Sequence, residues 1–248
     1  MMTQIIPTQS TDSYPARWAK LLDDLHQIAQ HSPTTAFANS LGAEDMVLQH
    51  ALSVLKQAHP ELSITSFVID TGRLHSATLQ LIDTIEQRYG TSLTVLHPDP
   101  EQVEAHVKAH GAFAFYESLA LRKACCTIRK VAPLQAFLPQ FSAWITGQRK
   151  DQAVTRAHLD FQEQDKVFGL IKFNPLRDWS FADIWTAIRH QQIPYNPLHD
   201  QGYPSIGCEP CTRAIKPDED LRAGRWWWEQ RDSVECGLHA SNLEHSQH

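Results

Sequence analysis

Apolar residues follow two different spacings along the first 150 residues of the chain. Trp18, Leu21, Leu25 and Ile28 recur at helical spacing and predict a helix over 17–30. The same pattern predicts helices over 46–56, 74–89 and 101–109, and short apolar or β-branched runs predict strands over 35–38, 62–69, 92–96 and 143–146. This alternation of strands and helices predicts an α/β fold, a parallel sheet with helices on both faces.

The pattern breaks down after about Tyr195, where proline, glycine and charged residues become more frequent. We therefore expect one main domain over 1–212 and a C-terminal tail over 213–248 that is extended or mobile. No internal repeat or low-complexity segment is present. The 248 residues are enough for a substantial core.

Composition excludes several classes of partner. Hydrophobic residues make up 42% of the chain and charged residues 20%, and the net charge is −6. This charge does not favour binding to nucleic acid or to an anionic membrane. No apolar run is long enough to span a bilayer, and residues 1–13 lack the profile of a signal peptide. We expect a cytoplasmic protein, in which paired cysteines bind metal or react more often than they form disulfides.

Two short motifs follow predicted strands and should lie at the carboxyl edge of the sheet. The segment 40–45 is Ser-Leu-Gly-Ala-Glu-Asp, in which a small residue and a glycine let backbone N–H groups approach an anion. The segment 70–72, Asp-Thr-Gly, closes the next strand and would line a nucleotide site from the other side. Taken alone, the segment 40–45 fits an ordinary βα turn better than an anion site, and the segment 70–72 fits an ordinary capped turn equally well. Glu44 and Asp45 would repel a further phosphate on a nucleotide bound there.

The five cysteines form two pairs and a singleton. Cys125 and Cys126 are adjacent, and Cys208 and Cys211 follow after 81 intervening residues. Four thiolates suit an iron–sulfur cluster or a zinc ion. Directly adjacent cysteines are unusual for zinc, and the basic run 122–130 would offset the negative charge of an iron–sulfur cluster. These features favour iron–sulfur, with zinc as the alternative.

The fifth thiol, Cys236, lies in a polar segment three residues before His239. This position suits a reactive thiolate, although an incidental tail thiol has the same surroundings. Arg222 and Arg225 precede it and are suited to bidentate binding of phosphate or sulfate, or are surface charges beside the tryptophans at 226–228.

Three motifs together resemble one family. They are Cys-Cys-x-x-Arg-Lys-Val at 125–131, Cys-x-x-Cys at 208–211 and Glu-Cys-Gly-Leu-His at 235–239. In this order they resemble the assimilatory, thioredoxin-dependent adenylyl-sulfate reductases of the phosphoadenylyl-sulfate reductase family, over roughly 35–239. The resemblance implies a PP-loop-type α/β domain and a 4Fe–4S cluster held by Cys125, Cys126, Cys208 and Cys211.

The same resemblance implies an activity and its residues. Adenosine 5′-phosphosulfate is reduced to sulfite and AMP through an S-sulfo-cysteine on Cys236, which thioredoxin or a similar dithiol resolves. The residues that match substrate-binding positions of the family are Ser40, Leu41, Gly42, Asp70, Thr71, Gly72, Lys130, Arg156, Arg222, Arg225 and His239.

Two other functions fit the residues. One is a reductase that accepts 3′-phosphoadenylyl sulfate, either as its only substrate or in addition to adenosine 5′-phosphosulfate. The other is a non-enzymatic redox sensor that holds zinc or a cluster. Nothing in the pattern decides whether the chain forms a homo-oligomer.

Overall fold

The computed structural model describes residues 14–153 and 156–229 of the chain. A six-stranded sheet in the order β3-β2-β1-β4-β6-β5 forms its centre. The strands are β1 (Thr35–Ala38), β2 (Ile64–Ile69), β3 (Thr94–Leu96), β4 (Ala143–Ile145), β5 (Gln162–Asp165) and β6 (Leu170–Phe173). Five of them run parallel, and β5 pairs antiparallel with β6 at one edge.

Seven α-helices surround the sheet in the described residues. They are α1 (Tyr14–His31), α2 (Ala43–Ala58), α3 (Ser76–Tyr89), α4 (Pro100–His110), α5 (Leu119–Cys126), α6 (Ala132–Phe137) and α7 (Phe181–His190). A π-helical turn, η3 (Thr127–Val131), joins α5 to α6, and the 3₁₀ turns are η2 (Ala114–Tyr116), η4 (Leu138–Gln140), η5 (Lys150–Gln152), η7 (Pro197–Gln201) and η8 (Glu209–Cys211). No described helix is long and apolar enough to cross a membrane.

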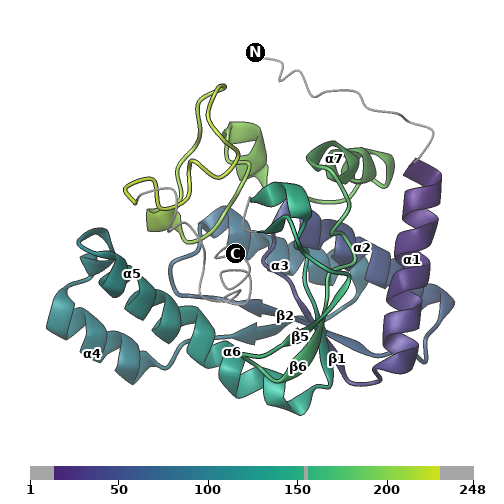
Figure 1. Cartoon of the computed structure of the whole chain (residues 1–248), viewed down its shortest axis with the longest axis horizontal. Coiled ribbons are helices and arrows are strands. Elements are labelled where there is room, and N and C mark those ends of the chain that lie inside the picture. The colour runs from purple at the N-terminus through teal and green to yellow at the C-terminus, as the bar shows by residue number, and fades with distance from the viewer. Residues whose placement is uncertain (1–13, 154–155, 230–248) are drawn as a thin grey trace.

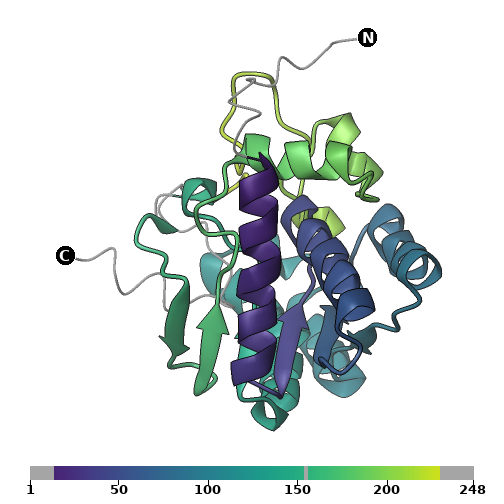
Figure 2. The same ribbon diagram turned by 90° about the vertical axis from the view of Figure 1, so that its right-hand side faces the viewer.

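Alternating residues of the central strands enter two separate cores. Phe37, Val68 and Ile145 pack with α1, α2, α3 and α7, whereas their neighbours Phe67 and Trp144 pack with α6. Figure 1 shows α6 on the opposite side of the strands from α2 and α7, and Figure 2 shows α1 running across one face of the sheet. Because helices cover both faces, the parallel strands are mostly apolar, with Thr35, Ser66 and Lys172 as buried polar exceptions.

The predicted helices and strands of the first 150 residues are all present, with ends shifted by a few residues. The antiparallel strand β5 corrects the expectation of a purely parallel sheet. Its sequence, Gln162–Asp165, is polar because it lies at the sheet edge, so it carries no apolar signal. The strand β6 and the helices α5, α6 and α7 were not predicted either.

Part of the expected tail is packed against the domain. Residues 213–229 have little regular structure, but Trp226 is 1% exposed and Arg225 is buried. The backbone N–H of Trp226 donates to the carbonyl of Cys211. The expectation of an extended segment from 213 onward is therefore wrong for 213–229. Residues 230–248 lie outside the described residues.

Candidate active site

A cavity of about 250 Å³ opens at the carboxyl ends of β1, β2 and β4. The chain runs from β1 outward to β3 on one side and returns through β4 on the other, so β1 and β4 meet at a topological switch point. Open parallel sheets bind ligands at this place because the loops after the two strands diverge and leave a crevice. The segments 204–207 and 221–226 close the cavity from the other side.

The loop after β1 forms one wall of the cavity through its own hydrogen bonds. The Asn39 side chain accepts from the N–H of Leu41 at 2.8 Å, which supports the left-handed backbone of Leu41 at φ 63°. Both the N–H and the hydroxyl of Ser40 donate to one carboxylate oxygen of Asp45. Gly42 caps α2 without any side-chain cap, so this wall presents an uncapped helix start to the cavity.

Asp45 is completely enclosed at this loop. Burial raises the pKa of Asp45 from 3.8 to about 7, against the two hydrogen bonds from Ser40, which lower it. Gly147, just after β4, lies so close to the Asp45 carboxylate that no side chain fits there. The Asp45 carboxyl group thus connects the end of β1, through Ser40, with the end of β4, through its close contact with Gly147.

Glu44 is held by residues far away in the sequence. The Arg149 guanidinium donates to Glu44 through Nε at 3.0 Å and Nη2 at 2.8 Å, and Gln152 donates to the same oxygen at 2.9 Å. Burial opposes ionisation, but the Arg149 charge and these hydrogen bonds outweigh it and lower the pKa of Glu44. Glu44 is therefore a charge-compensated carboxylate. We call this side, with Asn39, Ser40, Glu44, Asp45, Arg149 and Gln152, the strand-end wall.

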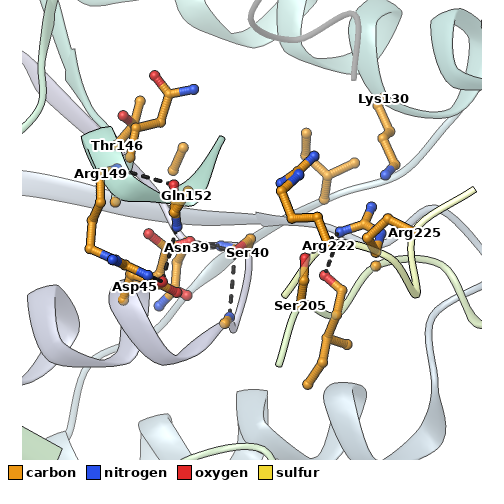
Figure 3. Close-up of a pocket in the computed structure, with 18 of the residues that line it drawn as sticks. Asn39, Ser40, Asp45, Lys130, Thr146, Arg149, Gln152, Ser205, Arg222 and Arg225 are labelled. Carbon is orange, nitrogen blue, oxygen red and sulfur yellow. Dashed lines mark hydrogen bonds and ion pairs between the residues drawn. The ribbon is translucent and has the colours of Figure 1, made fainter. Parts of the chain in front are cut away.

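The opposite side of the cavity is cationic. Figure 3 shows Lys130, Arg222 and Arg225 facing the strand-end wall across the cavity. Arg225 is buried, lies over the ring of Trp226 at 4.7 Å, and donates to the hydroxyl of Ser205 at 3.3 Å. It also lies so close to Gly207 that a side chain at that position would collide with it. We call Lys130, Arg222 and Arg225 the cysteine-side wall.

The four paired cysteines line one small pocket directly behind this wall. Cys125 and Cys126 end α5, and the chain at 208–211 is bound to the loop after β2 by a bridge between Leu74 and Cys208. The hydroxyl of Thr71 lies 3.2 Å from the Cys208 sulfur. The end of α5 and the segment 208–211, which are far apart in the sequence, thus bring the two cysteine pairs into one pocket. Among the described residues, no three side chains converge as the ligands of a single metal ion would.

The paired thiols are partly or fully buried in a pocket lined by cations. Burial raises the pKa of Cys211 to about 12, and the neighbouring Cys208 adds to this effect. Burial also raises the pKa of Cys125, which the Arg129 guanidinium partly offsets. Cations line the same pocket and would balance a buried negative group: Arg73, Arg122, Arg129, Lys130 and Arg225.

The cavity and the cysteine pocket share three lining residues, namely Lys130, Arg225 and Trp226. A group bound in the cavity therefore lies one side chain away from a group held by the four thiols. This shared wall is the main feature that the fold adds to the motifs.

The predicted substrate-binding residues are distributed unevenly. Those that line the cavity are Ser40, Gly42, Thr71, Lys130, Arg156, Arg222 and Arg225. Leu41, Asp70 and Gly72 do not line it: Leu41 is buried in the core, and Asp70 accepts from the N–H of Gly72 to shape the turn. Cys236 and His239 lie outside the described residues.

Two further residues in the cavity were not predicted. Gln148 is 3% exposed, and neither its amide nitrogen nor its oxygen has a hydrogen-bond partner among the described residues. The same holds for both ring nitrogens of His199, whose pKa is lowered by burial. Unpartnered buried polar groups in a cavity indicate a polar ligand. Gln148 follows the predicted strand 143–146 and was identifiable by that position, whereas the irregular sequence around His199 carries no signal.

Comparison with known proteins identifies the family. The model of the phosphoadenosine phosphosulfate reductase domain matches residues 34–214. The chain belongs to the phosphoadenosine phosphosulfate reductase domain family. A member from Burkholderia cepacia, named adenosine 5′-phosphosulfate reductase, is 50% identical over 98% of this chain and 95% of its own length. One of the same name from Allochromatium vinosum is 49% identical over 94% and 89%.

Solved structures agree with the family fold. A phosphoadenylyl-sulfate reductase from Candida auris matches with a TM-score of 0.66 at 24% identity, over 84% of this chain and 99% of that one. An FMN adenylyltransferase from Candida glabrata matches with a TM-score of 0.58 at 17% identity, over 96% and 85%. These similarities confirm for this member of the family the predicted α/β fold, which it shares with a nucleotide-transferring enzyme.

Proposed function

We propose that this chain reduces adenosine 5′-phosphosulfate to sulfite and AMP. One observation carries the proposal: Lys130 and Arg225, two of the three cations of the cysteine-side wall, line both the switch-point cavity and the four-cysteine pocket. The high identity to enzymes named adenosine 5′-phosphosulfate reductase, over nearly the whole chain, supports the same substrate. A thiol-dependent reaction of this kind fits a reducing compartment such as the cytoplasm.

The cavity offers different surroundings to the two ends of such a substrate. Apolar side chains from β2 and α6 line one part of it and suit the adenine ring, namely Phe67, Val68, Ile69 and Leu134. Lys130, Arg156, Arg222 and Arg225 also line it and suit the phosphosulfate, since guanidinium groups bind phosphate and sulfate through paired hydrogen bonds. The substrate would thus present its sulfate toward the cysteine-side wall.

Cys125, Cys126, Cys208 and Cys211 would hold a 4Fe–4S cluster in the pocket behind that wall. The five cations that line the pocket would balance the charge of a buried anionic group. When bound, the cluster would supply structure and electrostatic tuning at the wall. Lys130 would then stand between this group and the substrate.

Cys236 would be the nucleophile. Its thiolate attacks the sulfate sulfur, the bond from that sulfur to the phosphate oxygen breaks, and AMP leaves with the electron pair. Lys130 and the arginines offset the negative charge that otherwise keeps an anionic thiolate away from an anionic substrate. A dithiol protein of the thioredoxin type then attacks the Cys236 sulfur, sulfite leaves, and the second thiol of that protein resolves the mixed disulfide.

The test is a covalent adduct. Incubation with adenosine 5′-phosphosulfate without reductant should add one SO₃ group, about 80 Da, to the peptide that contains Cys236. Reduced thioredoxin should remove it and release sulfite. Cys236→Ser should keep nucleotide binding and the cluster and lose sulfite production. An adduct on another cysteine, or turnover by Cys236→Ser, would overturn the mechanism.

Substrate choice is tested in the same assay. We expect faster sulfite release from adenosine 5′-phosphosulfate than from its 3′-phosphorylated form. Equal or reversed rates would instead assign the chain as a dual-specificity or 3′-phosphoadenylyl-sulfate reductase. If protein that holds its metal turns over neither nucleotide, the result would favour the alternative function of a redox sensor.

A further inference from the structure

Aromatic side chains form an exposed patch beside the cysteine pocket. Six large hydrophobic residues are exposed in the described part of the chain, and four of them, Phe113, Tyr116, Leu119 and Trp227, come from η2, the start of α5 and the last described turn. The Tyr116 ring lies 6.4 Å from that of Phe113 and 6.2 Å from that of Trp227. We call these three rings the aromatic patch. Single exposed apolar residues are normal, but rings gathered in contact mark an interaction site.

The patch is held firmly on the outer side of the cysteine pocket. The Tyr116 hydroxyl donates to the carbonyl of Pro210, which lies between Cys208 and Cys211. The Arg73 guanidinium, which lines the cysteine pocket, lies 5.4 Å from the centre of the Phe113 ring. Figure 1 shows the end of the described chain, in yellow, beside the turn that leads into α5. The rings therefore form a fixed surface, because Tyr116 and Phe113 contact Pro210 and Arg73, which belong to the cysteine pocket or its loop.

The chain position of Cys236 connects this surface to the proposed reaction. Glu229 is fixed by two 2.8 Å hydrogen bonds from the buried Arg122. Cys236 follows seven positions later, so its Cα lies at most about 25 Å from that of Glu229, whatever the path of the chain between them. A protein that reacts with Cys236 therefore approaches within about 25 Å of the segment that carries Trp227 and Glu229.

We propose that the aromatic patch docks the protein dithiol that resolves S-sulfo-Cys236, an inference that rests on the proposed function. The dithiol is oxidised to a disulfide in two exchanges. Its first thiolate attacks the Cys236 sulfur, and sulfite leaves with the pair of electrons of the broken S–S bond. Its second thiolate then attacks the mixed disulfide and releases the Cys236 thiolate. Both exchanges need the two proteins to be aligned, and an apolar patch that includes Trp227, nine positions before Cys236 in the sequence, would provide that alignment.

The patch fits this occupant better than two others. Residues 230–248 contain no aromatic residue and only three large aliphatic ones, Val234, Leu238 and Leu243, so they are too polar to be its main cover. A second copy of the chain would need a larger apolar area, because stable dimers bury more surface than three rings supply. Transient redox encounters use small interfaces, and their partners must leave after each turnover.

Two reductants separate docking from chemistry. Phe113→Glu and Trp227→Glu should each lower kcat/KM for reduced thioredoxin at least about fivefold, because truncating an aromatic anchor at an interface costs more than about 1 kcal/mol. The same variants should turn over at the wild-type rate with excess dithiothreitol, which needs no docking surface. Formation of the SO₃ adduct on Cys236 should also be unchanged. Val167→Glu is the matched control, since Val167 is 43% exposed but lies in the β5–β6 turn.

Each other result would overturn the inference. Equal losses with both reductants would show damage to the site, and wild-type kinetics with thioredoxin would show that the patch is not used. A change of sedimentation coefficient in the variants would assign the patch to a second copy. If wild-type protein forms no adduct, the proposed function itself fails, and that outcome is visible before any patch variant is made.

Discussion

The two walls of the cavity are built in opposite ways. The strand-end wall comes from loops that follow β1 and β4, and its polar groups satisfy one another: Ser40 bonds to Asp45, and Glu44 bonds to Arg149. The cysteine-side wall comes from a π-helical turn and from irregular chain at 221–226. All three of its cations line the cavity, and two of them, Lys130 and Arg225, also line the cysteine pocket.

The contrast indicates a division of roles. A wall whose charges are already compensated sets the shape of the cavity and changes little when ligand arrives. A wall of cations that lines two pockets is suited to respond to what each pocket holds. Substitutions in the first wall should therefore act mainly on stability, and substitutions around the second mainly on turnover.

The largest effect is expected behind the cysteine-side wall. Cys208→Ser removes one of four proposed ligands, and sulfite production should fall at least about 100-fold, since even outer-shell changes at metal sites cost 10- to 100-fold. The protein should also lose absorption near 400 nm, the charge-transfer band roughly expected of an iron–sulfur cluster. Iron content per chain and the unfolding transition are measured together. A folded variant with full iron content would contradict the ligand set.

Substitutions in the strand-end wall should lower the free energy of unfolding. Arg149→Met leaves Glu44 buried without its cation, which should cost about 3–5 kcal/mol in the free energy of unfolding. Urea denaturation measures this cost, and adding Glu44→Gln should recover part of it. Lys150→Met is the control, because the Lys150–Asp178 pair at 2.8 Å is exposed and should contribute less than about 1 kcal/mol. Equal losses in the two single variants would show that the Arg149–Glu44 pair stabilises the fold no more than an exposed ion pair does.

Asp45 gives the strand-end wall a dependence on pH. Its pKa is about 7 in the folded chain against 3.8 ordinarily, so the unfolded chain releases this proton at lower pH. Stability should therefore fall as pH rises from about 4 to about 7 and be constant above. The loss is of order 4 kcal/mol, at 1.36 kcal/mol per pKa unit. Asp45→Asn should abolish that slope in urea denaturation at several pH values.

Asp178 provides a control of opposite sign. Hydrogen bonds from Lys150 and Arg177 lower the pKa of Asp178 in spite of partial burial. Its contribution to stability is therefore present at neutral pH and is lost as pH falls through the folded pKa. Asp178→Asn should destabilise the chain at pH 7 and have little effect in acid. Parallel pH profiles for the Asp45 and Asp178 variants would show that burial does not control Asp45.

The smallest effect concerns substrate choice. Glu44 and Asp45 line the cavity, and like charge would disfavour a 3′-phosphate. Arg149 compensates Glu44, and the pKa of Asp45 is near 7, so the repulsion is weakened. Glu44→Gln with Asp45→Asn should shift the kcat/KM ratio of the two nucleotides by about fivefold or less, the equivalent of one exposed ion pair. An unchanged ratio would remove these carboxylates from substrate selection.

Much of the architecture was predictable because it is encoded locally. The strand at 35–38 is found with the predicted bounds, since an apolar run between a helix and a loop with a glycine and acidic residues has one favourable conformation. The pairing of cysteines into one pocket also followed from their spacing. Some residues that were predicted to bind substrate do not line the cavity, because they shape a turn instead. Asp70 accepts a hydrogen bond from Gly72, and only their neighbour Thr71 lines the cavity.

By itself the sequence determined the alternation of strands and helices, the strand-end loops and the two thiol pairs, because spacing and turn chemistry act over a few residues. Only the tertiary structure decided which charges compensate each other and which pockets touch. Glu44 meets Arg149 across 105 positions. Lys130 and Arg225, which are far apart in the sequence, line the same two pockets. Such contacts depend on the order in which the strands pair in the sheet, and a local sequence pattern does not predict that order.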